Sequence, residues 1–409
     1  MEPISLHQEI TKALGSQNGI LFSSPAIVHR AMYTGRGIIA PNTQFIPEMV
    51  DERGSLPVEW WIMSKTEAKN AIPVKDEGIT SLLIGDQLVS LPTALRVAEK
   101  ELMGDYAALW PLTKILDIGG VKRQPNLTPE LNERSTEETE VPPIPCHVHA
   151  GDVVDGCCMG HGKTEAYFFP PLDVPPYNME LGPVKTRLGL RPDVTKDKVL
   201  SSLRHFGEND NLYPLLNEYQ IRPWESWTIE QKIIHAPGPW LTFEIQLPQD
   251  DFHLLAWVLG ERIASEELEE ARKTYHLRGL ESDEKLLDET LDWAGNTDPS
   301  FKERWWRECE VLQKGDWGKV VRLFYHGFYG EGFVVHPGAK YQREGEERPF
   351  AGIVWSGEGR ANSLAVSCQE KLRREFLVTP NNQLQLENTS HAHDLIVFTV
   401  FPLLKPAHS

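Results

Sequence analysis

The C-terminal part of the chain constrains the fold most, because between residues 316 and 403 it breaks into short apolar segments of strand length. Pro-Gly and Gly-Glu-Gly sequences punctuate these segments. Regularly spaced short strands with such turns are the pattern of a jelly-roll barrel. The strand-like segments are GKVVRLFYHGF, GFVVHPGAKYQ, FAGIVWSGEGRA, LAVS, FLVTPNN, LQLEN and LIVFTVFP.

Similar strand and turn signals earlier in the chain predict a second barrel. At 409 residues the chain exceeds the size of about 250–300 residues at which a single core stops growing. We therefore predict a mainly β fold of two jelly-roll (double-stranded β-helix) barrels with helical insertions. The first barrel is expected to span residues 1–255 with a helical insertion around 185–230, a helical connector 256–312, and the second barrel 313–409.

Helical periodicity appears in a few stretches between the strand signals. Apolar residues recur at helical spacing in 92–104 and again in 193–207. From 254 to 312 the sequence is charged and helical in pattern. Within it, Asp298 and Pro299 resemble an N-cap followed by proline, which predicts a helix over the sequence FKERWWRECEVL.

The charge balance restricts the possible partners. The chain has 41 Lys and Arg against 59 Asp and Glu, a formal net charge of −18. This charge opposes binding to nucleic acid or to an anionic membrane surface. Most charges are interpreted as solvated. Lys114, in a predicted strand over 110–118, is likewise interpreted as an outward, solvated lysine, the alternative being a lysine that faces the pocket.

Cysteine usage and the lack of a targeting signal indicate the compartment. The five cysteines are an odd number, and Cys157 and Cys158 are adjacent, which does not resemble a disulfide framework. The first residues lack a basic and apolar signal pattern, and the apolar run Leu395–Leu404 is too short to span a bilayer. We predict a cytoplasmic protein, with no prediction of its oligomeric state.

A pair of histidines carries the chemistry of the first barrel. His147 and His149 are two residues apart, so on a strand both imidazoles leave the same face of the sheet. Glu165 follows, directly before the aromatic strand-like run 166–169. A returning strand could therefore carry a carboxylate to the histidine pair.

A fourth candidate ligand is His235, which precedes a Pro-Gly turn and the alternating run Trp240–Leu247. Imidazoles with one carboxylate suit zinc, iron, manganese or nickel, and the residue types do not choose among them. A histidine pair without a metal, on the surface or in the core, is the alternative. Four histidines near the C-terminus lack a carboxylate at the same spacing and predict no second metal site: His326, His336, His391 and His393.

At this point the sequence resembles the type I mannose-6-phosphate isomerases, zinc-dependent enzymes of the cupin fold, and particularly their short bacterial branch. The resemblance runs from about residue 59 to 250. Six motifs carry it: Glu59-Trp60-Trp61, the strand Leu112–Asp117, His147-Val148-His149, Gly162-Lys163-Thr164-Glu165, His235-Ala236-Pro237-Gly238, and Glu244-Ile245-Gln246 with Gln249-Asp250 after it.

The resemblance implies a ligand set and catalytic residues. The zinc ligands of the family fall on His147, His149, Glu165 and His235. The family's lysine, implicated in substrate binding or proton transfer, falls on Lys163, and its acidic strand residues fall on Glu244 and Asp250. One departure is Leu254, which stands where members of the family carry an arginine close to the substrate.

These residues predict a metal-dependent aldose–ketose isomerase of a sugar or sugar phosphate, active in carbohydrate metabolism. A divalent metal, with zinc as the first choice by resemblance, would stabilise the charge that develops during proton transfer between adjacent carbons. The alternatives are a non-catalytic sugar-binding or regulatory cupin and another metal-dependent cupin enzyme. The expected partner is a small sugar or sugar phosphate.

Overall fold

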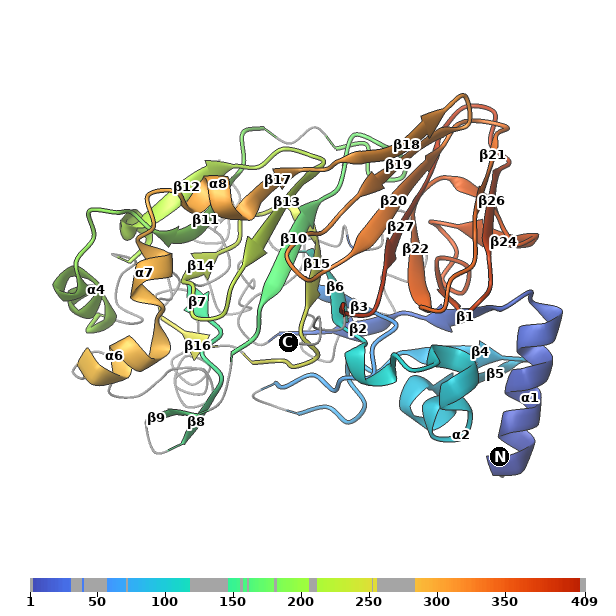
Figure 1. Ribbon diagram of the computed structural model, residues 1–409, viewed down its shortest axis with the longest axis horizontal. Coiled ribbons are helices and arrows are strands. Elements are labelled where there is room, and N and C mark those ends of the chain that lie inside the picture. Colours follow the sequence, from blue (N-terminus) through green and yellow to red (C-terminus); the bar gives the residue numbers. More distant parts are fainter. Residues whose placement is uncertain are drawn as a thin grey trace, which may run out of the picture.

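The structure is a computed structural model that describes residues 3–30, 39, 57–70, 73–117, 146–154, 157–159, 162–179, 182–205, 212–251, 253–255 and 284–404. It is mainly β, with antiparallel sheets and a few helices, as the sequence predicts for cupin-like domains (Figure 1). The polar segment before His147, most of the charged stretch 256–312 and the side chains of Cys157 and Cys158 lie outside the described residues.

A seven-stranded sheet forms the centre of the molecule. Its strand order is β17 (Trp306–Glu308), β13 (Glu225–Ile229), β10 (Glu165–Phe169), β15 (Leu241–Gln246), β6 (Leu112–Asp117), β3 (Glu59–Ile62) and β2 (Ala26–Val28). All six residues of β6 and all five of β10 are buried, because both faces of this sheet are covered. A strand that is buried on both faces has a continuous apolar sequence. The aromatic run after Glu165 has this pattern because both faces of β10 are covered.

A five-stranded sheet covers one face of the seven-stranded sheet and completes the first barrel. Its order is β12 (Leu216–Gln220), β11 (Lys185–Leu190), β14 (His235–Ala236), β7 (His147–Val148) and β16 (His253–Leu254). The two sheets meet through rings such as Tyr219 and Trp227, whose centroids are 4.5 Å apart. The short β8 (Asp152–Val154) and β9 (Cys157–Met159) form a separate hairpin.

The second barrel combines a nine-stranded and a four-stranded sheet. The nine-stranded order is β18 (Val311–Gly315), β19 (Gly318–Arg322), β20 (Gly330–Val335), β27 (Leu395–Val400), β22 (Phe350–Ser356), β25 (Glu375–Val378), β1 (Ile20–Ser24), β4 (Ser81–Ile84) and β5 (Gln87–Ser90). The four-stranded order is β21 (Lys340–Arg343), β26 (Leu384–Asn388), β23 (Glu358–Ala361) and β24 (Leu364–Ser367). The strand segments predicted between 316 and 403 are confirmed.

One strand crosses from the N-terminal part of the chain into the second barrel. Ile20 in β1 pairs with Val378 in β25, so the nine-stranded sheet is continuous with strands from the first hundred residues. The nine-stranded sheet also packs on the outer face of the seven-stranded sheet, where the ring of Phe168 lies 5.0 Å from that of Phe398. The two barrels therefore share an apolar core, and each also has a smaller apolar cluster of its own. The division at residues 255 and 312 stays a prediction.

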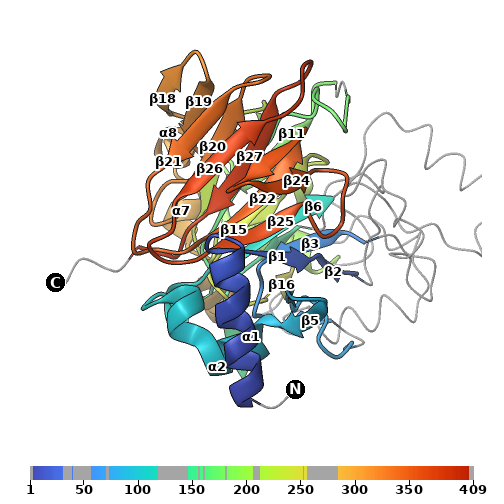
Figure 2. The ribbon, with the colours of Figure 1, turned by 90° about the vertical axis from the view of Figure 1, so that its right-hand side faces the viewer.

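The helices lie around the sheets. They are α1 (Pro3–Ser16), α2 (Leu91–Met103), α4 (Lys196–Leu203), α6 (Glu284–Thr290), α7 (Trp293–Asn296) and α8 (Phe301–Trp305), with 3-10 turns η2 (Ala107–Leu109) and η3 (Tyr213–Leu215). Figures 1 and 2 both place α1 and α2 side by side, and Figure 1 shows them next to β4 and β5, with α4, α6 and α7 at the opposite end. No helix of the described residues is long and apolar enough to cross a membrane.

Two helical predictions need correction. The helix expected over FKERWWRECEVL ends at Trp305, and β17 follows because Trp306 pairs with Trp227 in β13. Tertiary pairing here overrides the local helical pattern. In the predicted helical insertion around 185–230, α4 is present, but β11, β12 and β13 account for most of the regular structure.

Candidate metal centre and its charge network

Two of the predicted ligands lie opposite each other in the five-stranded sheet. His147 in β7 pairs with His235 in β14, and the ring centroids are 4.0 Å apart. Residues directly opposite in an antiparallel pair project from the same face of the sheet. Leu254 pairs with His147, and Leu188 pairs with His235, so two apolar side chains flank the histidines on that face.

His149 joins this pair just after β7 ends. Its ring centroid is 5.1 Å from that of His147 and 5.0 Å from that of His235. The three rings each offer a nitrogen, and these atoms lie within 4.8 Å of one another. Within the described residues this is the group of side chains that could hold a metal ion.

Gly162 allows the opposite sheet to approach the histidines. A Cβ atom at this position would lie 1.8 Å from the carbonyl oxygen of His149, so no other residue fits without moving the backbone. The glycine of the Gly-Lys-Thr-Glu motif therefore brings Lys163 and Glu165 against the histidine strand. Gly238 has the same role in the His-Ala-Pro-Gly motif, since its Cβ would lie 1.9 Å from the carbonyl oxygen of Lys185.

Glu165 opens β10 on the facing sheet and points at two of the histidines. Its Oε2 lies 3.1 Å from Nε2 of His149, and its Oε1 lies 3.1 Å from Nε2 of His235. The hydroxyl of Tyr167, two residues along the strand, also donates to Oε1. All of these side chains are buried.

The orientation of the two imidazoles fits a bound cation. Nδ1 of His149 lies 2.6 Å from the carbonyl oxygen of Asp251, and Nδ1 of His235 lies 2.8 Å from that of Ile233. A carbonyl accepts, so each Nδ1 carries a hydrogen, and in a neutral ring Nε2 then turns a lone pair toward Glu165. Lone pairs facing a carboxylate repel unless a proton or cation lies between them. Backbone carbonyls orient metal-bound histidines in the same way.

Electrostatics keeps the carboxylate of Glu165 ionised. Burial by itself would raise the pKa of Glu165, but His149 and Lys163 hold the pKa well below its usual range. Burial and the charge of Lys163 act to lower the pKa of His149, but the charge of Glu165 and the hydrogen bonds to Asp251 and Glu165 together raise it. An ionised carboxylate beside two imidazoles is a donor set that suits zinc and other borderline divalent metals.

Lys163 connects this centre to a second carboxylate. Its Nζ donates to Oε1 of Gln246 at 2.6 Å and lies 3.3 Å from Oε2 of Glu165. On the other side, it lies 3.9 Å from Oε1 of Glu244. Oε1 of Glu244 is buried and accepts no hydrogen bond from a described residue. Burial and the charge of Glu165 raise the pKa of Glu244 to about 7.

The prediction that Lys114 is an outward, solvated lysine is wrong. Its side chain is 4% exposed, because β6 lies in the middle of a sheet covered on both faces. Lys114 Nζ lies 4.0 Å from Glu244 Oε1, 3.6 Å from Asp250 Oδ1 and 3.4 Å from Glu59 Oε2. The lysine thus bridges three buried carboxylates.

Arg30 closes the network at its far end. Its guanidinium donates to both oxygens of Asp250, at 3.0 and 3.1 Å, and to both oxygens of Glu59, at 2.7 and 3.2 Å. The backbone N–H of Lys69 donates to Asp250 as well. Burial opposes ionisation of Asp250, but Arg30 and Lys114 hold its pKa far below the usual range.

The buried charges of the centre are unequal. The buried acidic residues are Glu59, Glu165, Glu244, Asp250 and Asp251, and the buried basic residues are Arg30, Lys114 and Lys163. An uncompensated buried charge is costly, so an excess of carboxylates in this space favours a bound divalent cation.

The structure brings together the histidines, Glu165, Lys163 and Glu244, all of which the sequence analysis named. Other residues of the charge network were not named from the sequence. Tyr167 could have been found, because it lies two residues after Glu165 and so shares its face of the strand. Arg30 gave no signal, since its part of the chain shows no clear periodicity. Of the C-terminal histidines, His336 pairs with Asp394.

Comparison with known proteins gives a fold-level relationship. No protein-family model matches the chain, and a search of curated proteins gives no match. Among solved structures, the chain is similar to a protein from Archaeoglobus fulgidus described as a mannosephosphate isomerase, with a TM-score of 0.58 and 13% identity over 94% of this chain and 98% of that one. It is also similar to the mannose 6-phosphate isomerase of Bacillus subtilis, with a TM-score of 0.55 and 13% identity over 94% and 100% of the chains.

A phosphomannose isomerase from Salmonella typhimurium gives a TM-score of 0.54 at 10% identity, over 94% of this chain and 100% of that one. At such low identity the likeness concerns the fold. The chain therefore has the overall fold of these isomerases along nearly its whole length.

Proposed function

We propose that this chain is a metal-dependent aldose–ketose isomerase of a sugar or sugar phosphate. The observation that supports it most is the pair of imidazoles, His149 and His235, that turn their Nε2 atoms toward Glu165 inside the barrel. The ligand set proposed is His147, His149, Glu165 and His235. Zinc is our first choice of metal, because histidine and glutamate are common ligands of catalytic zinc.

When bound, the metal supplies a Lewis acid that polarises the sugar's carbonyl and hydroxyl oxygens. Isomerisation also needs a base that moves a proton between two adjacent carbons. We assign that role to Glu244, whose Oε1 accepts no hydrogen bond from a described residue and whose pKa of about 7 suits a general base. Its carboxylate takes the proton from one carbon and returns it to the next.

Lys163 is proposed to stabilise the negative charge that develops on the substrate oxygens. Its Nζ lies between the ligand Glu165 and the base Glu244, so a positive charge is fixed beside the reacting groups. The proposal of a catalytic role for Asp250 remains a prediction. In the structure, Arg30 engages both of its carboxylate oxygens, which suits a role in holding Lys114 beside Glu244.

The solved isomerases with this fold make mannose 6-phosphate the first substrate to test. Leu254 bears on the choice between phosphorylated and free sugars. It is buried on the same face of the sheet as His147, so an arginine at this position would point into the same space. Without that guanidinium we expect slow turnover of mannose 6-phosphate, lower by on the order of a hundredfold than with Leu254→Arg.

The test is a steady-state assay of phosphorylated and free hexoses and pentoses on the wild type and on Glu244→Gln. We expect the wild type to isomerise at least one sugar, and Glu244→Gln to lower kcat by about 10²–10⁴-fold with its metal content unchanged. Equal turnover by the two proteins would remove Glu244 as the base. No turnover of any sugar by metal-loaded protein, with thermal stabilisation by a sugar intact, would instead support the sugar-binding alternative.

A further inference from the structure

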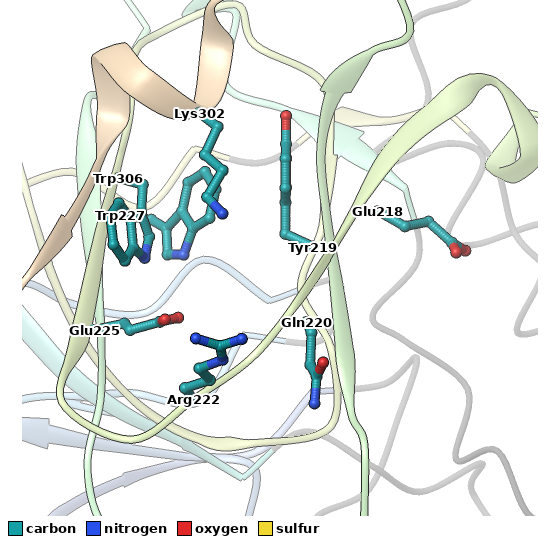
Figure 3. A pocket seen from close by; sticks show the side chains of 8 residues that line it. All are labelled: Glu218, Tyr219, Gln220, Arg222, Glu225, Trp227, Lys302 and Trp306. Carbon is teal, nitrogen blue, oxygen red and sulfur yellow. The ribbon is translucent and has the colours of Figure 1, made fainter.

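A cavity of about 230 Å³ lies at the edge of the first barrel, where β12, β13, α8 and β17 meet. It shares no residue with the metal centre. The side chains that line it include three aromatic rings and three charged groups: Tyr219, Trp227, Trp306, Arg222, Glu225 and Lys302. Figure 3 shows the two indole rings on one side, Tyr219 facing them, and Glu225 and Arg222 at the bottom.

Aromatic rings form the walls of this cavity. Trp306 pairs with Trp227 across β17 and β13, so both rings belong to the same face of the sheet. The ring of Tyr219 lies 4.5 Å from that of Trp227. Nζ of Lys302 lies 5.1 Å from the centre of the Trp306 ring. Flat apolar walls with a few polar groups are typical of small-molecule sites.

Two buried polar atoms in the cavity have no hydrogen-bond partner among the described residues. They are Nε1 of Trp227, which is 1% exposed, and Oε2 of Glu225, which is 6% exposed and whose carboxylate already has hydrogen bonds from the side chain of Trp306 and the backbone of Arg222. A buried polar group without a partner costs free energy, so each atom favours a ligand that satisfies it. The carboxylate oxygen needs a donor, and the indole N–H needs an acceptor.

The type of ligand follows from these two needs. A hydroxyl group both donates and accepts, so neighbouring hydroxyls satisfy Glu225 and Trp227 together. An organic ammonium ion could not accept from the indole N–H and would meet the positive charges of Arg222 and Lys302. A phosphate would meet the carboxylate of Glu225. The volume is below the roughly 300–1,000 Å³ of sites for drug-sized ligands, which indicates a single ring.

We propose that this cavity binds the ring of a neutral monosaccharide. The apolar C–H face of a pyranose stacks on the indole of Trp306, since an aromatic face attracts the positive edge of C–H groups. Its hydroxyls bridge Glu225 Oε2 and Trp227 Nε1. The inference does not rest on the proposed isomerase activity, because none of the metal-centre residues takes part.

The test is binding of methyl hexopyranosides, whose locked rings cannot open and therefore cannot be isomerised. Binding to the full-length, metal-loaded protein is followed by calorimetry at millimolar ligand. We expect saturable binding to the wild type, and a loss of about tenfold in affinity in Glu225→Gln, because a neutral amide replaces a charged acceptor of the sugar hydroxyl. Trp306→Ala should lose more, since it removes both the stacking surface and a hydrogen bond that orients Glu225.

Trp305→Ala is the matched control, because this neighbouring tryptophan packs against His326 and does not line the cavity. It should bind the glycoside as the wild type does. Absence of glycoside binding, or equal binding by Glu225→Gln, Trp306→Ala and the wild type, would overturn the proposal. Binding of choline or inorganic phosphate in place of the glycoside would overturn the assignment of the ligand class.

Discussion

The two faces of the seven-stranded sheet carry opposite chemistry on the same strands. In β10, Glu165 and Tyr167 point into the first barrel and join the metal centre, whereas Phe168 points into the core shared with the second barrel. In β15, Glu244 lies in the charge network and Phe243 packs in that core. Alternate residues of one strand thus serve two environments.

This arrangement separates the chemistry of the site from the packing of the fold. Buried charges on one face are tolerated because the strands that carry them are fixed by aromatic packing on the other. The separation is not complete: like the buried Arg374 next to it in the chain, Glu375 lies in the shared core. Its oxygens accept from Trp60 Nε1 at 2.9 Å and from the backbone N–H of Met63 at 2.6 Å. A carboxylate therefore ties the two barrels together.

The largest expected effect comes from the site face of β10. In the double variant His149→Ala, Glu165→Ala, we expect complete loss of the bound divalent metal and of isomerase activity, because two of the proposed ligands are removed. Elemental analysis of the purified proteins measures this. The same metal content in the variant and the wild type would exclude the site.

On the core face of the same strand, Phe168→Ala should affect stability and leave the metal in place. Removing a fully buried ring leaves a cavity and costs about 3–5 kcal/mol. Denaturant unfolding measures the loss, and elemental analysis of the folded fraction serves as the control. A variant that loses its metal while keeping its stability would show that the two faces are not independent.

The buried carboxyl of Glu375 predicts that the stability of the fold depends on pH. Burial raises the pKa of Glu375 from 4.5 to about 7. Between these values the folded chain holds a proton that the unfolded chain has lost, so this residue makes stability fall as the pH rises, by up to roughly 3 kcal/mol. Urea unfolding at pH 5 and pH 8 should show a smaller drop in Glu375→Gln than in the wild type. Equal drops would contradict the assignment.

The smallest effect is expected from Tyr167→Phe, which removes the hydroxyl that donates to Glu165. Loss of a group that orients a metal ligand typically weakens metal affinity by about 10–100-fold. Competition with a chelator measures it. Tyr329→Phe is the matched control, because Tyr329 donates to Glu331 in the second barrel at 2.7 Å. If both variants weaken metal binding equally, the effect is not local to the site.

Local sequence determined the strands and the motifs. The predicted strand segments after residue 316 are strands in the structure, because turn residues and β-branched or aromatic runs act over a few neighbours. The spacing of two in the histidine pair brings both rings together, although β7 ends at Val148 and His149 lies just beyond it. The glycines at 162 and 238 belong to these motifs, although the close backbone contacts that require them are visible only in the fold.

Only the tertiary structure decided which faces are covered and which distant segments meet. β1 joins the second barrel, Lys114 is buried and Arg30 reaches Asp250 because of pairings between segments that are far apart in the chain. Strand periodicity assigns a residue to one of two faces, but it does not say what packs against that face. Long-range register and sheet-on-sheet packing supply that information, so a lysine that the sequence pattern presents as solvated becomes part of a buried charge network.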